Sequence, residues 1–165
     1  MPTPNPPSEH GPDHRPDPDL LRATRALALA ARALERASSE RDLTLAQFRI
    51  LALISAGDER SSLLAERLAV AKPTITAVVD GLVERGLVAR EAVAGDRRSI
   101  RVALTPAGLV ALRSAEEEMS ETLARIFGYA RDRDALIGAL LDLDDALTAR
   151  MTERMQARQR GEVVR

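Results

Sequence analysis

The chain of 165 residues contains no cysteine, no tryptophan and only two histidines. The lack of cysteine excludes disulfides, thiolate zinc sites, cysteine nucleophiles and thiol-based redox sensing. Both histidines, His10 and His14, lie in a proline-rich N-terminal stretch. The rest of the chain therefore lacks the commonest general base and metal ligand. We expect no enzyme activity, no catalytic residue, no metal site and no cofactor.

Aromatic residues make up 2% of the chain, which leaves few ring faces for stacking the bases of single-stranded nucleic acid. Long apolar runs are also missing. The longest stretch without a charged residue, Val102 to Leu112, has eleven residues, whereas a membrane-spanning helix needs about 20. The N-terminus lacks the basic and apolar regions of a signal peptide. These absences predict a cytoplasmic protein with no membrane partner.

Apolar residues (45%) and charged residues (30%) are both plentiful, and the net charge is -1. This composition is typical of one compact domain, or of one subunit of a small oligomer. Because the chain is not basic overall, any role with nucleic acid rests on local charge. Residues 1–16 are rich in proline and predict a disordered tail, and residues 161–165 predict a flexible end.

Residues 17–160 predict a mainly α fold with one small β-hairpin. Three long amphipathic helices are expected at 18–38, 106–127 and 133–160. Between them, residues 44–105 predict a tri-helical unit that ends in a hairpin. Its signals are a capping box at Thr44 and Gln47, a short helix at 63–70, a helix from Pro73 to a C-terminal cap at Gly86, and strands LVARE and SIRVAL joined by a turn AVAGDRR.

This order of elements is that of a winged helix-turn-helix, in which the second helix of the pair enters the major groove of DNA. Steps of about 100° per residue place Ile75, Val78, Val79 and Leu82 on the core side of that helix. The outward side carries Pro73, Ala77, Asp80, Gly81 and Glu84, with Thr74 and Thr76 on its flanks. Small residues and the donors Lys72, Thr74 and Thr76 near the helix start suit contacts with bases and phosphates. Alternatively, this is an ordinary amphipathic helix of a small helical domain.

The hairpin favours the DNA-binding interpretation. Arg97, Arg98 and Arg101 crowd its turn and second strand, and Asp96, taken as the one acid close by, is positioned to brace an arginine. An arginine at the tip of a projecting hairpin can enter a narrow minor groove. From Ser61 to Leu104 the basic residues exceed the acidic ones by two, seven against five.

From about Leu20 to Met155 the chain resembles the MarR family of bacterial transcription regulators. The resemblance is carried by LAERLAVAKPTITAVVDGLVERGLVAREAVAGDRRSIRVALTPAG. It implies a homodimer formed by the first and last helices, two winged helices on half-sites of a pseudo-palindrome, and repression relieved by a small ligand. By this match the start of the recognition helix holds Lys72, Pro73, Thr74 and Thr76, and Asp96 with Arg98 matches the wing signature. Alanine stands at position 71, where the family commonly has serine.

The apolar stripes of the first and last helices support a dimer independently, since sharing them between two chains buries both. The alternative is that they pack within one chain. Arg49 is a candidate partner for an anionic ligand, although an exposed arginine on a solvated face is the simpler interpretation. The carboxylates of Asp144, Asp145 and the run from Glu116 to Glu118 are expected to be solvated.

The sequence therefore predicts a sequence-specific regulator of double-stranded DNA, acting as a repressor that a small molecule releases. Its expected DNA-binding residues are Lys72, Pro73, Thr74, Thr76, Ala77, Arg97, Arg98 and Arg101. The alternative is a winged-helix protein-interaction module without DNA affinity, which would present an apolar patch on the same surface.

Overall fold

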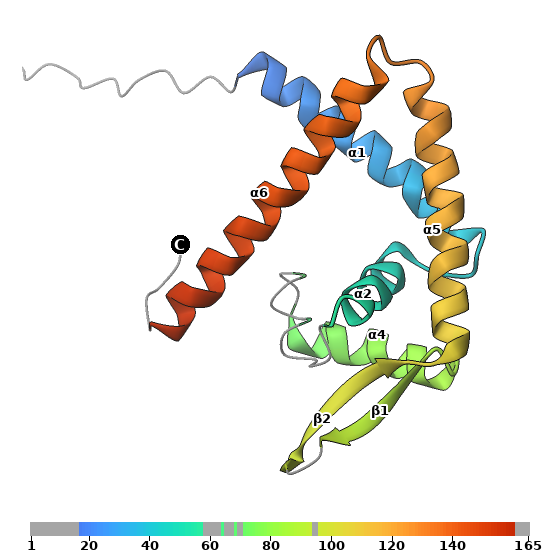
Figure 1. Cartoon of the computed structure of the whole chain (residues 1–165), viewed down its shortest axis with the longest axis vertical. Coiled ribbons are helices and arrows are strands. Elements are labelled where there is room, and N and C mark those ends of the chain that lie inside the picture. Colours follow the sequence, from blue (N-terminus) through green and yellow to red (C-terminus); the bar gives the residue numbers. More distant parts are fainter. Residues whose placement is uncertain (1–16, 58–63, 65–67, 69–70, 94–95, 161–165) are drawn as a thin grey trace, which may run out of the picture. The chain divides into compact units, whose positions relative to one another are not determined.

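A computed structural model describes residues 17–57, 64, 68, 71–93 and 96–160. The chain divides into two compact units, residues 1–33 and 34–165. Figure 1 labels the elements, which are α1 (Pro18–Ser39), α2 (Leu45–Ser55), α4 (Lys72–Glu84), β1 (Val88–Val93), β2 (Asp96–Leu104), α5 (Pro106–Phe127) and α6 (Arg133–Gln159). The predicted fold class, mainly α with one antiparallel hairpin, is confirmed. The predicted tail at 1–16 and the end at 161–165 lie outside the described residues.

Helix α2 begins at the predicted capping box. The Gln47 amide donates to the Thr44 hydroxyl at 3.2 Å, and the Thr44 amide donates to the Gln47 side chain at 3.0 Å. Much of the short helix predicted at 63–70 lies outside the described residues. Within it, the Leu68 amide donates to the Leu64 carbonyl at 3.0 Å, the spacing of one α-helical turn. Both leucines contribute to the core.

Helix α4 ends where Gly86 adopts a left-handed conformation, with φ of 68°. The Gly86 amide donates to the Val83 carbonyl at 2.9 Å and the Leu87 amide to the Leu82 carbonyl at 2.9 Å. This pair of bonds is a Schellman motif, which glycine favours because it has no Cβ. Leu82 and Leu87 are both buried in the core, so the motif fixes the direction in which the chain leaves α4 for the hairpin.

The two strands are longer than the sequence pattern indicated. Their register runs from Val88↔Leu104 to Ala92↔Ile100 and then shifts to Val93↔Asp96. Arg97 and Arg98, predicted to lie in the turn, therefore belong to β2, inside an irregular stretch of the ladder. Such bulges add residues to one strand and escape a simple alternation of apolar and polar residues, which explains the wrong turn boundary.

Thr105, Pro106 and Gly108 form the junction between the hairpin and α5. The Thr105 hydroxyl accepts from the Gly108 amide at 3.0 Å and donates to the Gly86 carbonyl at 2.7 Å. It thus caps α5 and ties its start to the end of α4. A Cβ on Gly108 would lie 1.9 Å from the Leu87 carbonyl oxygen. Only glycine allows this close approach of α5 to the residue before β1.

One core joins the elements of the winged helix-turn-helix. Its fully buried members come from α2, α4, both strands and α5, and include Leu51, Val79, Leu82, Val102 and Leu112. Ile75 and Val79 point into this core as predicted, and Val78 packs at its margin. The core therefore determines which side of α4 faces outward.

The long helices α1 and α6 expose many of their apolar residues. In α1 the side chains of Leu20, Leu27 and Leu29 are exposed, and in α6 those of Leu141, Leu143 and Leu147. In the described residues, no helix combines the length and the apolar character that crossing a membrane requires.

Candidate nucleic-acid interface

The first turn of α4 contains no side-chain cap and no acidic residue of its own. Ala71 is its N-cap residue, makes no side-chain cap and has an extended conformation, and Pro73 occupies the first turn. No acidic residue lies in that turn. The amide groups at the start of a helix carry a partial positive charge that favours phosphates and other anions. The backbone of Lys72 lies at this end; its side chain is outside the described part of the structure.

The outward side of α4 carries small residues, as predicted. Pro73, Thr74, Thr76 and Ala77 are all exposed, whereas Ile75 between them is buried. Threonine hydroxyls both donate and accept hydrogen bonds, and small side chains let a helix approach base edges closely. The structure therefore brings these predicted residues together on one accessible surface.

The second half of α4 is held by two polar contacts that the sequence analysis did not identify. Arg90 of β1 forms an ion pair with Asp80. Near the end of the helix, Arg85 donates to the side chain of Gln47 at 3.2 Å, the same side chain that takes part in the α2 capping box. Alternation along β1 could have indicated the first contact, because Arg90 lies on the same face as the buried Val88.

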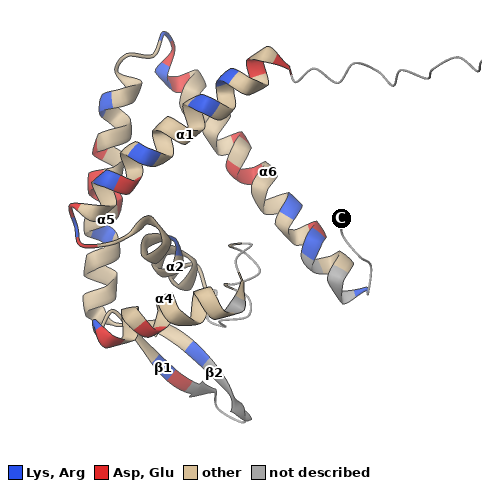
Figure 2. Ribbon diagram, turned by 180° about the vertical axis from the view of Figure 1, so that it is seen from behind, with Lys and Arg blue, Asp and Glu red and all other residues tan. Residues whose placement is uncertain are grey.

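The hairpin contains an ion pair that changes the assignment of one predicted residue. Arg101 donates to the Glu91 carboxylate through Nη2 at 2.7 Å and Nε at 2.9 Å. These residues face each other across the ladder. Asp96 is therefore not the one acid close to the arginines, and the charge of Arg101 is partly compensated within its own hairpin. Figure 2 shows basic and acidic segments side by side on the two strands.

Arg97, Arg98 and Asp96 lie in β2, at the end of the hairpin away from α5. Their side chains are outside the described part of the structure. Their assignment as wing contacts, with Asp96 as a brace, remains a prediction that rests on the sequence.

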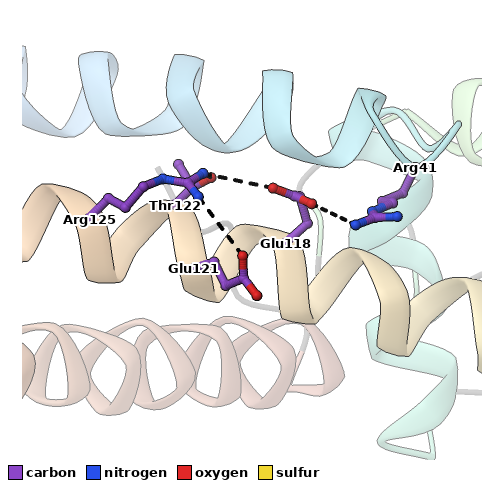
Figure 3. Close-up of polar contacts among 5 residues, drawn as sticks. All are labelled: Arg41, Glu118, Glu121, Thr122 and Arg125. Carbon is purple, nitrogen blue, oxygen red and sulfur yellow. Dashed lines mark hydrogen bonds and ion pairs between the residues drawn. The ribbon is translucent and has the colours of Figure 1, made fainter.

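A second charged cluster surrounds Glu118 on α5 (Figure 3). Arg41, in the connection between α1 and α2, donates to the Glu118 carboxylate at 2.7 Å. Arg125 lies 3.8 Å from the other oxygen of Glu118 and 3.9 Å from Glu121, and it donates to the Thr122 hydroxyl at 2.8 Å. The cluster therefore ties the connection before α2 to the middle of α5.

The prediction that the run from Glu116 to Glu118 is solvated is wrong for its last residue. The Glu118 side chain is only 14% exposed, because it turns toward Arg41, whereas Glu116 and Glu117 are exposed. Asp144 and Asp145 are exposed, as expected, and so is Arg49.

The described residues include no group of histidine, cysteine and acidic side chains that could hold a metal ion. A wide open groove lies between the connection before α2 and the start of α5. Its lining is mostly small or charged and comprises Glu40, Arg41, Asp42, Pro106, Ala107, Val110, Ala111 and Ser114.

A helix pair and a following hairpin around a common core define the class of protein, a winged helix-turn-helix. Residues 41–99 match the model of the MarR family. This match agrees with the resemblance to the MarR family that the sequence showed. MosR from M. tuberculosis, a solved relative that is 27% identical over 81% of this chain, is a transcriptional regulator.

Solved structures of regulators have the same fold over most of the chain. A mutant of MarR from E. coli is 23% identical, with a TM-score of 0.69 over 81% of this chain and 99% of that one. The regulator MosR from M. tuberculosis, in complex with DNA, is 28% identical, with a TM-score of 0.58 over 81% and 98%. CouR from Rhodococcus jostii, bound to p-coumaroyl-CoA, is 21% identical, with a TM-score of 0.62 over 90% and 96%.

Proposed function

We propose that the protein binds double-stranded DNA in a sequence-specific way and regulates transcription. The observation that carries the proposal is the outward side of α4, where exposed small and polar residues lie at a helix start whose first turn has no acidic residue. A helix with this start fits the major groove, where each base pair presents a distinct pattern of donors and acceptors. The DNA complex of MosR, a relative with the same fold, supports the assignment.

In this proposal two groups of residues have different roles in DNA binding. Pro73, Thr74, Thr76 and Ala77 approach the base edges and set sequence preference. Lys72, Arg97 and Arg98 bind phosphates or the minor groove and set affinity, with Asp96 bracing an arginine of the wing. Arg101 contributes less than its neighbours, because Glu91 compensates its charge.

The proposed active form is a homodimer built by α1 and α6. Exposed leucines on both helices offer apolar surface that a second copy can cover. Two winged helices related by a two-fold axis then reach half-sites about 34 Å apart, one turn of DNA. The operator is accordingly expected to be a pseudo-palindrome.

In this proposal the protein represses transcription of a bacterial chromosome in the cytoplasm. Binding of a small organic ligand relieves the repression. CouR, which shares the fold, was solved with p-coumaroyl-CoA bound. Because the chain lacks cysteine, release by thiol oxidation is excluded.

Selection of bound duplexes from a random library tests the proposal. The full chain is expected to enrich an inverted repeat whose half-sites lie about 10 base pairs apart, and to bind it more tightly than a scrambled duplex. The winged-helix docking alternative predicts no enrichment at moderate salt. Enrichment of single half-sites only would contradict the dimer while leaving DNA recognition in place.

A further inference from the structure

The ion pair between Asp80 and Arg90, here called the α4–β1 ion pair, joins the recognition helix to the wing. Val88 and Arg90 lie on the same face of β1, since side chains alternate along a strand. Val88 is buried in the core, and so is Val102, the cross-strand neighbour of Arg90. Arg90 therefore takes the next inward position along the hairpin, where it reaches α4 rather than the core.

The neighbouring residue makes a contact of a different kind. Glu91 lies on the opposite face of β1 and pairs with Arg101 of β2. This cross-strand ion pair holds the two strands together, whereas the α4–β1 ion pair holds the hairpin to the helix. Two consecutive residues of β1 thus make different contacts, one within the hairpin and one with α4.

The α4–β1 ion pair also lies close to the proposed base-reading residues. Asp80 follows Thr76 by four residues, which is about 6 Å along a helix axis, and both lie toward the outward side of α4. A bare carboxylate there would repel the phosphates of a bound duplex. Arg90 compensates that charge and at the same time links the hairpin to α4.

We propose that Asp80 and Arg90 are positioning residues that set the angle between the wing and the recognition helix, and so determine how well the protein distinguishes its operator from other DNA. This inference rests on the proposed function. Both side chains remain substantially exposed, 46% for Asp80 and 41% for Arg90. Exposed ion pairs contribute little to folding stability, so removal of the pair is expected to change DNA discrimination without unfolding the protein.

The test is a double-mutant cycle with Asp80→Asn, Arg90→Gln and the combined variant. The probes are a duplex selected by the wild-type protein and a scrambled duplex of the same length, each titrated at several salt concentrations. Positioning predicts that each single variant lowers the ratio of the two affinities by about three- to tenfold, with the combined variant no worse than either single one. Thermal melting confirms that all variants are folded.

A pure charge effect gives a different pattern. Asp80→Asn would then tighten binding to both duplexes equally, Arg90→Gln would weaken both equally, and the combined variant would match the wild type. That outcome, with unchanged affinity ratios, would overturn the inference while leaving the proposed function intact. A wild-type protein that does not discriminate between the duplexes would overturn both.

The matched control is the ion pair between Arg41 and Glu118 (Figure 3), which lies on α5 and the connection before α2. Arg41→Gln removes a comparably exposed arginine from an ion pair that does not involve α4 or β1. Its affinity ratio is expected to equal that of the wild type. An equal loss of discrimination in this variant would contradict a specific role for the α4–β1 ion pair.

Discussion

Helices α4 and α6 both carry exposed residues, and these residues differ in kind. The exposed residues at the start of α4 are small or polar, such as Thr74, Thr76 and Ala77. Those of α6 include large leucines, with Leu141 62% and Leu147 49% exposed. A polar surface at a positive helix end suits a hydrated anion such as DNA. Exposed leucines suit the apolar surface of another protein, so one chain presents surfaces for two kinds of partner.

The largest effect is expected from placing a charge among the leucines of α6. In a two-fold dimer each subunit contributes residue 147 to the interface, so Leu147→Glu places two carboxylates there. Burying them unpaired is expected to cost about 3 kcal/mol or more in the free energy of dimerisation. We expect the dimer to dissociate and affinity for the selected duplex to fall about 100-fold, as measured by analytical ultracentrifugation and binding titration. Thr148→Glu, the neighbouring exposed position, is the control. A Leu147→Glu protein that stays dimeric would contradict the assignment of α6.

The second largest effect is expected from a comparison of the tight packing around Gly108, near the start of α5, with the open surface of α6. Gly108→Ala puts a Cβ against the Leu87 carbonyl, so we expect a loss of about 1 to 3 kcal/mol in the free energy of unfolding. Gly138→Ala on α6 meets no atom within 4 Å and is expected to gain up to about 1 kcal/mol from helix propensity. Denaturant unfolding measures both. Equal effects of the two substitutions would show that the junction at Gly108 has room to relax.

Removing a single hydroxyl from α4 tests the polar surface directly. Thr74→Ala is expected to change the preferred sequence and to cost about 1 to 3 kcal/mol for each lost base contact on the selected duplex, with little change on a scrambled one. A repeat of the duplex selection measures the preference. Ser120→Ala, which removes an exposed hydroxyl from α5, should return the wild-type motif. The same motif from both variants would remove Thr74 from the set of base-reading residues.

The smallest effect is a change in salt dependence from the wing. Arg98→Ala is expected to weaken binding to all duplexes alike and to reduce the slope of log K against log salt concentration by about 0.9 per subunit. Arg113→Ala, an exposed arginine on α5, is the control and should leave the slope unchanged. A slope that Arg98→Ala does not alter would contradict a phosphate contact by this residue.

Local patterns were sufficient to predict most of the fold. The capping box at Thr44, the helix end at Gly86 and the helical spacing of Ile75, Val79 and Leu82 depend on residues close together in the chain, so the sequence alone reveals them. The same spacing predicted that Thr74 and Thr76 face outward.

Contacts between residues that are far apart in the chain could not be predicted from the sequence. The bulge that draws Arg97 and Arg98 into β2 depends on how two strands align, and the need for glycine at position 108 depends on the Leu87 carbonyl. The partners of Asp80 and Glu118 lie on other elements, 10 and 77 residues away in the chain. Charge counting along the sequence therefore could not show which arginines are neutralised, whereas the structure pairs Arg90 and Arg101 with acids.

Methylation protection on the selected duplex tests the entry of α4 into the major groove most directly. Dimethyl sulfate modifies guanine N7, which lies in the major groove, and adenine N3, which lies in the minor groove. With the wild-type protein we expect protection of guanine N7 within each half-site and of adenine N3 only in the flanking sequence that the wing reaches. Protection confined to adenine N3 would contradict base reading by α4. The same conclusion would follow if Thr74→Ala and the wild type protected guanine N7 at the same positions and bound with equal affinity.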